Sequence, residues 1–470
     1  MRIPRILIGA AGSGSGKTLL TCALLAAFQR DGKRLRAFKC GPDYIDPMFH
    51  RTVLHVPSEN LDTFFTGEGG TRRLFLEAAE GADLAVMEGV MGLYDGLGGI
   101  CEEGSTYHLA KATKTPVILV IDAHGMGRSV LPLIAGFLSY DTEGLIRGII
   151  LNRMTQAFYE TIRPEIERTF PAKLLGYVPK LPELGLTSRH LGLKLPGEQE
   201  GLRKQLAEAA AVLRQTVDLG RLLAIADGAV PLYKEETLPV SEEREASVRR
   251  KEAARAQVKI AVARDEAFCF YYENNLRMLK NAGARLLFFS PLRDKEIPKE
   301  ADALLLGGGY PELFSGELAE NAAMLADVRE KITAGLPTAA ECGGFLYLHE
   351  ELEDMEKRRH KMAGIVPGAC FYTGRPVRFG YVELQEKKEI FLPRGDVIRG
   401  HEFHYFDSEN NGTGCRAKKP VSGKGWDCII HGETQWLGFP HLYYASNPEF
   451  VRRFLGKAKE HAKRAQTRIN

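Results

Sequence analysis

A glycine-rich turn near the start of the sequence carries the residue types needed to bind a nucleotide. Residues 11–18 read Ala-Gly-Ser-Gly-Ser-Gly-Lys-Thr, after a short apolar stretch and before a stretch rich in Ala and Leu. This order of strand, loop and helix is the P-loop pattern, with Ala11 at the first glycine position. Backbone N–H groups must point at the phosphates, and the start of a helix adds partial positive charge, so small residues are needed there.

We therefore predict an ATP site on this loop. The glycines that cradle the phosphates are Gly12, Gly14 and Gly16. Lys17 is expected to reach the β- and γ-phosphates, and the Thr18 hydroxyl is expected to bind Mg²⁺. Partitioning-type P-loop ATPases that dimerise over ATP carry an extra lysine at the position of Gly12, so this loop favours synthesis over a dimer switch.

Four carboxylates are expected close to the mouth of this loop. Asp43 and Asp46 follow the apolar stretch 35–39, and two nearby prolines favour a fixed loop over a helix. Glu88 directly follows the stretch 84–87, and Asp95 lies in the glycine-rich segment after it. Carboxylates repel phosphates unless a cation intervenes, so the cluster predicts Mg²⁺ coordination. Solvated turn residues or helix caps are the alternative interpretation.

Two later polar residues fit the same site less specifically. Asn152 follows a further apolar stretch, and it could contact the adenine base or serve as a turn residue. Arg189 could meet a phosphate or a substrate carboxylate, or it could form a surface salt bridge.

A cysteine in the second half of the chain indicates a second chemistry. Cys342 follows the stretch 337–340 and precedes two glycines and an apolar segment, which is the pattern of a nucleophile elbow. Such an elbow would expose the sulfur and point a helix N-terminus at it, favouring the thiolate. A run of three glycines follows another predicted strand, and the N–H groups of Gly308, Gly309 and Gly343 are expected to form an oxyanion hole.

A thiol nucleophile also needs a base. The downstream candidates are His401, His404, His431 and His441, and spacing alone does not choose among them. His401 and His404 flank a glutamate, but one residue fewer separates it from the second histidine than in a zinc-protease motif. We therefore predict no zinc site there.

Composition excludes several classes of protein. The 470 residues are 44% hydrophobic and 26% charged, as in ordinary globular proteins, and the formal net charge of +3 is too small to suggest a nucleic-acid partner. The start of the sequence has no signal-peptide pattern, and no apolar run is long enough for a membrane span. Eight scattered cysteines include no C-x-x-C pair, so we expect reduced thiols and a cytoplasmic protein.

Apolar stretches that indicate buried parallel strands alternate with helical segments in both halves of the chain. In the first half they are 35–39, 84–87, 117–121, 146–151 and 174–178, and a second series starts at 258. This alternation predicts two doubly wound α/β domains, with ligands at the carboxyl ends of the strands. A charge-rich segment separates them, so we expect domains at 1–235 and 258–455, a linker at 236–257 and a basic tail at 456–470.

Eight segments together resemble the cobyrinic acid a,c-diamide synthase family, glutamine-dependent amidotransferases of corrinoid biosynthesis. The resemblance follows the family's order and covers nearly the whole chain. The segments are residues 39–47, 88–96, 189–193, 307–312, 341–348, 378–381, 400–404 and 441–447.

This resemblance implies a dethiobiotin-synthetase-like P-loop domain that uses Mg-ATP to make an acyl phosphate on the a and c acetate side chains of cobyrinate. It implies a class I glutamine amidotransferase-like domain with Cys342 as nucleophile and His441 as base. The residues that match the family's acidic motifs are Asp43, Asp46, Glu88 and Asp95. The wider glutaminase class has His-x-Glu, but Tyr443 stands at the glutamate position, so a Cys–His dyad is expected.

Two alternatives remain. The same reaction could act on hydrogenobyrinate or a nickel sirohydrochlorin. From another class, the chain could be a partitioning or regulatory ATPase with a degenerate amidotransferase domain, although Gly12 and the intact elbow at Cys342 count against it. We further expect a tetrapyrrole substrate, no nucleic-acid or membrane partner, and a homodimer.

Overall fold

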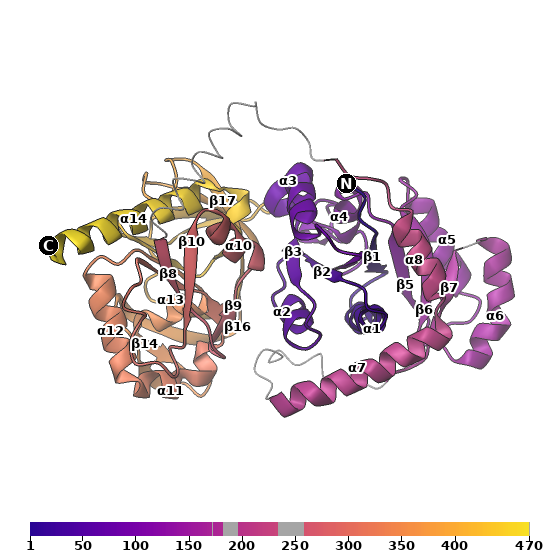
Figure 1. Cartoon of the computed structure of the whole chain (residues 1–470), viewed down its shortest axis with the longest axis horizontal. Helices are drawn as coiled ribbons and strands as arrows, with labels where there is room; N and C mark the ends of the chain where they lie inside the picture. Colours follow the sequence, from indigo (N-terminus) through magenta and orange to yellow (C-terminus); the bar gives the residue numbers. More distant parts are fainter. Residues whose placement is uncertain (172, 182–195, 234–257, 470) are drawn as a thin grey trace. The chain divides into compact units, whose positions relative to one another are not determined.

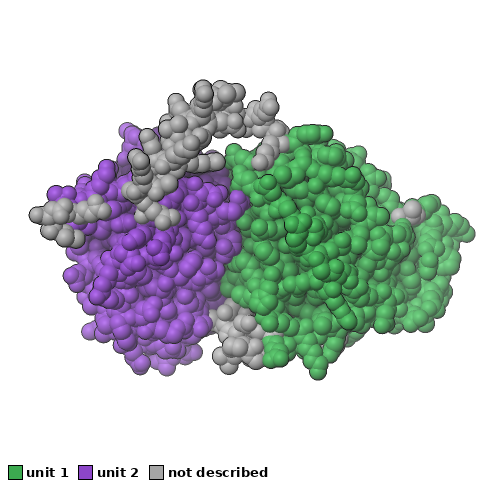
Figure 2. Space-filling model, in the orientation of Figure 1, with its two compact units in different colours: residues 1–236 green, residues 237–470 purple. Residues whose placement is uncertain are grey.

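The computed structural model describes residues 1–171, 173–181, 196–233 and 258–469. It divides into two compact units, Met1–Glu236 and Thr237–Asn470 (Figures 1 and 2). The expected linker at 236–257 lies outside the described residues.

Unit 1 is built on a seven-stranded sheet in which all neighbouring strands are parallel, in the order β3-β2-β4-β1-β5-β6-β7. The strands are β1 (Arg5–Ala10), β2 (Leu35–Cys40), β3 (Ser58–Leu61), β4 (Leu84–Glu88), β5 (Val117–Asp122), β6 (Ile146–Asn152) and β7 (Leu174–Val178). The predicted strands are confirmed, with ends that shift by a residue or two. The sequence did not indicate β3, because Ser58-Glu59-Asn60 is polar although all three residues are buried.

Helices cover both faces of this sheet (Figure 1). They are α1 (Lys17–Arg30), α2 (Ile45–Thr52), α3 (Thr63–Ala78), α4 (Thr106–Ala112), α5 (Val130–Tyr140), α6 (Gln156–Thr169), α7 (Pro196–Thr216) and α8 (Leu219–Asp227). Ala37 of β2 packs in one core with α1, α7 and α8. The next residue, Phe38, points to the opposite face and meets Phe75 of α3, with ring centroids 5.3 Å apart.

The order of the strands decides where unit 1 binds ligands. β1 lies between β4 and β5, and the chain builds the sheet first on one side of β1 and then on the other. Loops after the central strands therefore diverge at their carboxyl ends, which opens a crevice. The P-loop after β1 and the segment after β4 both lie at this edge.

One local prediction was wrong. Residues 42–47 were expected to form a fixed loop, but Asp46 and Pro47 lie in the first turn of α2. Proline is tolerated there, because the first N–H groups of a helix have no intrahelical acceptor.

Unit 2 carries a six-stranded sheet in the order β10-β8-β11-β13-β21-β20, parallel except for the last pair. Its strands are β8 (Val258–Ala263), β10 (Ala284–Phe289), β11 (Ala303–Leu306), β13 (Thr338–Glu341), β20 (Ile430–His431) and β21 (Gln435–Gly438). The helices are α10 (Glu273–Asn281), α11 (Ser315–Glu320), α12 (Ala322–Thr333), α13 (Gly343–Tyr347) and α14 (Glu449–Ile469).

A second sheet of unit 2 is dominated by the long antiparallel pair β16 and β17. Its strands are β14 (His349–Glu353), β15 (Arg359–Lys361), β16 (Val366–Glu386), β17 (Val397–Ser408), β18 (Cys415–Lys418), β19 (Gly425–Cys428) and β22 (His441–Leu442). The short strands β9 (Phe268–Phe270) and β12 (Gly308–Gly309) form a separate pair.

The sequence pattern of the second half predicts helices at 268–282 and at 316–334, and both predictions need correction. The helix expected at 268–282 begins only at Glu273, because residues 268–270 form β9 against the glycine run. The helix expected at 316–334 is interrupted at Asn321, whose side-chain amide donates to the backbone oxygen atoms of Pro291 and Asp294.

Residues 456–469 continue α14, in which Ala458 is buried. No helix in the described part of either unit is long and apolar enough to cross a membrane.

A buried arginine closes the amino end of unit 1's central strand. Arg5 is fully buried, and its guanidinium donates hydrogen bonds to backbone oxygens. The acceptors are Thr113 at 3.0 Å, Ile3 at 2.9 Å, Lys114 at 3.0 Å and Val230 at 2.6 Å. Removing the guanidinium would leave these carbonyls buried without a donor.

We predict that Arg5→Met lowers the free energy of unfolding of unit 1 by about 3 kcal/mol, because several buried acceptors lose their partner. That loss corresponds to a melting temperature lower by roughly 6–12 °C in calorimetry. Arg73→Met, at an exposed position of α3, is the matched control and should change little. Equal melting of both variants would contradict the assigned role.

Candidate active sites

The P-loop of unit 1 has the geometry that a phosphate cradle requires. Gly16 adopts φ +90° and precedes Lys17, the first residue of α1. The Lys17 Nζ donates to the backbone oxygens of Gly12 at 3.0 Å and Met91 at 2.5 Å. Burial lowers the pKa of Lys17. The ammonium therefore folds over its own loop, where bound phosphate oxygens would replace these carbonyls.

Asn152, the last residue of β6, braces the loop. Its side-chain amide donates to the Ser15 carbonyl at 2.8 Å. A Cβ added at Gly16 would lie 2.3 Å from the Asn152 nitrogen, so this approach, together with the positive φ, requires glycine. The expected contact of Asn152 with adenine stays a prediction.

Two of the four predicted carboxylates, Asp46 and Glu88, meet in a buried cluster behind the P-loop. The Thr18 hydroxyl donates to Glu88 Oε1 at 2.6 Å. Lys39 Nζ lies 2.8 Å from the same oxygen and 2.5 Å from Asp46 Oδ2. Burial opposes ionisation of Glu88, but Lys39 and His50 outweigh it and hold the pKa of Glu88 well below its usual value. Burial and the charge of Glu88 raise the pKa of Asp46.

The other two carboxylates are engaged with their own loops. Asp43 accepts a hydrogen bond from the Ile45 N–H at 2.7 Å, and Asp95 accepts one from the Gly92 N–H at 2.8 Å. Both carboxylates therefore accept hydrogen bonds within their own turns, as expected of turn residues and not of Mg²⁺ ligands. Their charges still reach the site, because Asp43 raises the pKa of Lys39 and Asp95 raises that of Lys17, in both cases against the lowering effect of burial.

Sequence reasoning missed two residues of this cluster. Lys39, at 4% exposure, supplies the positive charge between the carboxylates. His50 of α2 is fully buried, with Nε2 3.5 Å from Glu88 Oε2 and Nδ1 3.1 Å from Ser58 Oγ. A lysine ending a buried strand beside two carboxylates was the available signal, whereas nothing in the sequence indicated His50.

The donor set suits a hard cation. Thr18 and Glu88 offer adjacent oxygens, and Glu88 Oε2 accepts no hydrogen bond from any described residue. Mg²⁺ prefers such oxygen ligands together with substrate phosphates. Arg189, the remaining candidate of this half, lies outside the described residues.

In unit 2, Cys342 forms the predicted sharp turn between β13 and α13. It has φ +46° and ψ −102°, a conformation that a non-glycine residue adopts only under constraint. The expectation of an exposed thiolate is corrected. Cys342 is 7% exposed and α13 has only five residues, so burial and the charges of Glu312 and Glu402 raise the pKa of the thiol.

The predicted oxyanion glycines pack against the elbow. A Cβ on Gly343 would lie 3.0 Å from the Gly309 nitrogen and 2.9 Å from Pro311 Cδ. A Cβ on Gly308 would lie 2.3 Å from His441 Cε1. The glycine run therefore fits between the turn after Cys342 and the imidazole, with no room for a side chain.

Strand pairing brings His441 to the same place. Glu341 pairs with Gly438, and the Cys342 N–H donates to the Gly438 carbonyl at 2.9 Å. His441 follows three residues later and is 3% exposed. Burial lowers the pKa of His441 to about 3, so the imidazole is neutral and able to accept a proton.

The other candidate bases have different partners. His404 Nε2 lies 2.9 Å from Glu402 Oε2. His401 pairs with His441 across β17 and β22. His431 Nδ1 lies 3.2 Å from Glu386 Oε1, on another part of the unit. The geometry thus favours His441, the candidate packed on the glycine run.

One group of possible metal ligands was not indicated by any sequence motif. In the described part of the chain, ligand atoms of Glu386, Cys415 and His431 lie within 4.8 Å of one another. Burial raises the pKa of the Glu386 carboxyl to about 7. The three residues come from β16, β18 and β20, which spacing alone could not bring together.

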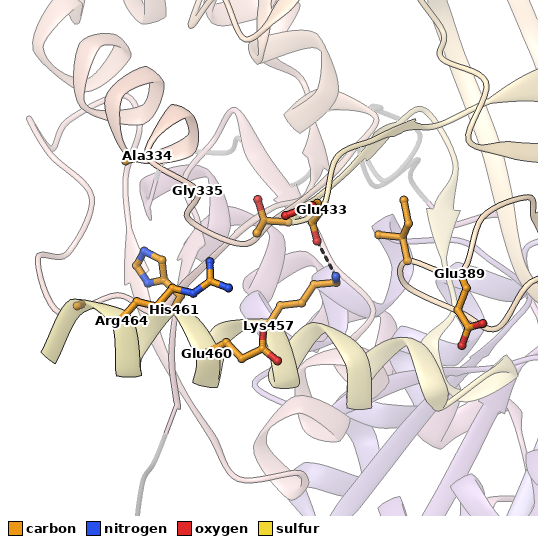
Figure 3. A pocket seen from close by; sticks show the side chains of 11 residues that line it. Ala334, Gly335, Glu389, Glu433, Lys457, Glu460, His461 and Arg464 are labelled. Atoms are coloured by element: carbon orange, nitrogen blue, oxygen red, sulfur yellow. Dashed lines mark hydrogen bonds between the residues drawn. The ribbon is translucent and has the colours of Figure 1, made fainter. Parts of the chain in front are cut away.

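Unit 2 has a hollow of about 450 Å³ beside α14 (Figure 3). Its lining includes Gly335, Thr434 and the α14 residues Lys457 and Arg464. Gly335 and Thr434 precede β13 and β21, whereas Cys342 follows β13. The hollow is therefore at the amino ends of these strands and is not part of the thiol site.

Comparison with known proteins decides the family. Residues 6–192 match the CobQ/CobB/MinD/ParA nucleotide binding domain, and residues 259–434 match the CobB/CobQ-like glutamine amidotransferase domain. A cobyrinate a,c-diamide synthase of Listeria innocua is 37% identical over 97% of this chain and 99% of that protein. The cobyrinate a,c-diamide synthase of Salmonella typhimurium is 37% identical over 96% of this chain and 98% of that protein. The cobyrinate a,c-diamide synthase of Caldanaerobacter subterraneus is 36% identical over 96% of this chain and 97% of that protein.

This chain belongs to the cobyrinate a,c-diamide synthase family. It is a glutamine-dependent amidotransferase of the ligase type, with a nucleotide-binding unit 1 and an amidotransferase unit 2. The predicted family and both predicted domain types are confirmed.

We predict that Gly308→Ala lowers glutamine-dependent amidation by about 10²-fold, because the added methyl would displace the His441 ring. Amidation from added ammonia should be unchanged. Gly316→Ala, in α11 with its nearest atom 3.9 Å away, is the matched control. Full glutamine use by Gly308→Ala, measured as amide formed per minute, would show that this packing is not required.

Proposed function

We propose that this chain converts cobyrinate to its a,c-diamide with ATP and glutamine, or ammonia, in cobalamin biosynthesis. The observation that carries the proposal is full-length similarity to proteins of that name, over both units. The P-loop of unit 1 and the cysteine elbow of unit 2 supply the two chemistries that such a reaction needs.

In unit 1, the substrate carboxylate attacks the γ-phosphorus of ATP, ADP departs, and an acyl phosphate forms. The N–H groups of the glycine-rich loop and Lys17 would hold the phosphates in line for this transfer. Ammonia then attacks the acyl carbon, and phosphate leaves. A free carboxylate resists this attack because it is already anionic, so activation must come first.

Mg²⁺ fits the oxygens of Thr18 and Glu88, with Asp46 close by. When bound, it would neutralise charge on the transferring phosphoryl group. Lys39 holds both carboxyl groups in place and favours the ionised form of Glu88. Asp43 and Asp95 would shape the loops that face the substrate.

In unit 2, the Cys342 sulfur attacks the glutamine amide while His441 takes the thiol proton. The N–H groups of Gly308, Gly309 and Gly343 would hold the developing oxyanion. His441 returns the proton to the departing nitrogen, ammonia leaves, and a γ-glutamyl thioester remains. Water then releases glutamate and restores the thiol.

The functional boundaries that we propose are 1–235 for synthesis and 258–455 for glutamine hydrolysis, with 236–257 as linker and 456–470 as tail. The partner is a corrinoid, and a homodimer in the cytoplasm is the assembly that we propose.

A panel of macrocycles tests the substrate. Purified protein receives cobyrinate, hydrogenobyrinate or nickel sirohydrochlorin with ATP and glutamine, and mass spectrometry detects the amides. We expect the diamide from cobyrinate at the highest kcat/KM. Amidation of nickel sirohydrochlorin with none of cobyrinate would overturn the assignment.

Two substitutions test the division of labour. Cys342→Ser should abolish glutamine use and leave ammonia-dependent amidation intact, because only the nitrogen source is lost. Lys17→Ala should lower amidation from both nitrogen sources by about 10²-fold or more, because phosphoryl transfer loses its charge stabilisation. Loss of ammonia use in Cys342→Ser, or full activity in Lys17→Ala, would refute this division.

A further inference from the structure

A buried carboxylate stands beside the imidazole of the thiol site. Glu341 ends β13 and directly precedes Cys342. Its Oε2 lies 3.9 Å from His441 Nδ1. The side chains of both residues are under a tenth exposed, so little water screens them from each other.

The surroundings of Glu341 do not otherwise explain a carboxylate. Tyr444 Oη donates to Oε1 at 3.5 Å, and the Leu442 N–H bonds the carboxyl. Both donors are neutral, so neither bond requires an ionised acceptor. Among the described residues, no lysine or arginine forms an ion pair with Glu341, and His441 is its ionic partner within 4 Å. Burying a carboxylate is costly, so its retention beside a histidine points to a charge that the histidine uses.

Two residues after His441 stands Tyr443, which has no carboxylate to offer the imidazole. Tyr443 is fully buried, and its ring packs against Tyr272 with centroids 5.2 Å apart. Glu402, the other buried carboxylate of this region, is 2.9 Å from His404 and 3.4 Å from Arg378. Within the described part of the chain, Glu341 is thus the carboxylate that forms an ion pair with His441.

We propose that Glu341 is the positioning residue that orients His441 and stabilises its protonated form, so that unit 2 works with a Cys342–His441–Glu341 triad. This proposal rests on the proposed roles of Cys342 and His441. It places the acidic member of the triad next to the nucleophile in sequence, at the end of the same strand.

The chemistry follows from the proton balance. When Cys342 attacks the amide, its proton passes to the ring nitrogen of His441 that faces it, and the imidazolium carries the positive charge. Glu341 accepts a hydrogen bond from Nδ1–H and offsets that charge without taking the proton. The 3.9 Å separation is long for a hydrogen bond, as catalytic contacts often are before substrate binds.

Before the reaction begins, Glu341 and His441 are both uncharged. Burial raises its pKa to about 8, and burial lowers the pKa of His441 to about 3, so the empty site favours the uncharged forms. His404 also lowers the pKa of His441. The positive charge of the imidazolium lowers the pKa of the neighbouring carboxyl, so Glu341 releases its proton to solvent and the ion pair exists only while His441 holds the thiol proton.

Glu341→Gln tests the proposal, because it keeps the shape of the side chain and removes the ionisable group. We expect kcat for glutamine hydrolysis to fall about 10²-fold with little change in KM, and Cys342 to react correspondingly more slowly with iodoacetamide. Ammonia-dependent amidation and the melting temperature should match the unsubstituted chain. Glu341→Asp should recover part of kcat, because the carboxylate is restored at shorter reach.

Asp354→Asn is the matched control, since Asp354 is also buried in unit 2 beside a histidine, 2.9 Å from His360 Nε2. It should leave glutamine hydrolysis unchanged. A kcat within twofold of the unsubstituted chain for Glu341→Gln would overturn the proposal, as would a parallel loss of melting temperature and ammonia use. Glutamine hydrolysis surviving in Cys342→Ser or His441→Ala would instead refute the proposed function itself.

Discussion

Charge compensation at the carboxyl edge of the unit 1 sheet is the interaction on which the rest of that site depends. Glu88 and Asp46 are both buried, and each would repel the other and any nearby phosphate if Lys39 were absent. Lys39 forms ion pairs with both carboxyl groups. Glu88 in turn accepts a hydrogen bond from the Thr18 hydroxyl at the start of α1. The position of the P-loop is therefore tied to the acidic cluster through one ammonium group.

Unit 2 meets the opposite requirement. The groups proposed to react there are uncharged at rest, because burial favours protonated Cys342 and neutral His441. Close packing rather than charge sets the geometry, since Gly308 touches the imidazole and Gly343 touches the glycine run. A dry, neutral pocket suits a nucleophile that must form charge only in the transition state. The two units thus stabilise charge at different moments of one overall reaction.

The sequence predicted the features that depend on short runs of consecutive residues. The P-loop, the elbow and most strands follow from local pattern, because glycine spacing and apolar runs report directly on backbone conformation. It could not show β3, whose polar Ser58 and Asn60 are buried by neighbouring elements. Nor could it show His50 or Glu341 as partners of Glu88 and His441, since those contacts depend on which strands pair. The predicted loop at Asp46 was wrong because proline in a first helical turn looks like proline in a loop.

Activation of an inert carboxylate in unit 1 is the central claim, and an isotope experiment tests it most directly. Cobyrinate carrying oxygen-18 in its a and c carboxylates is amidated with ATP and ammonia, and the inorganic phosphate released is analysed by mass spectrometry. An acyl phosphate requires one labelled oxygen to pass into phosphate for each amide formed. Unlabelled phosphate alongside full amide formation would contradict the account.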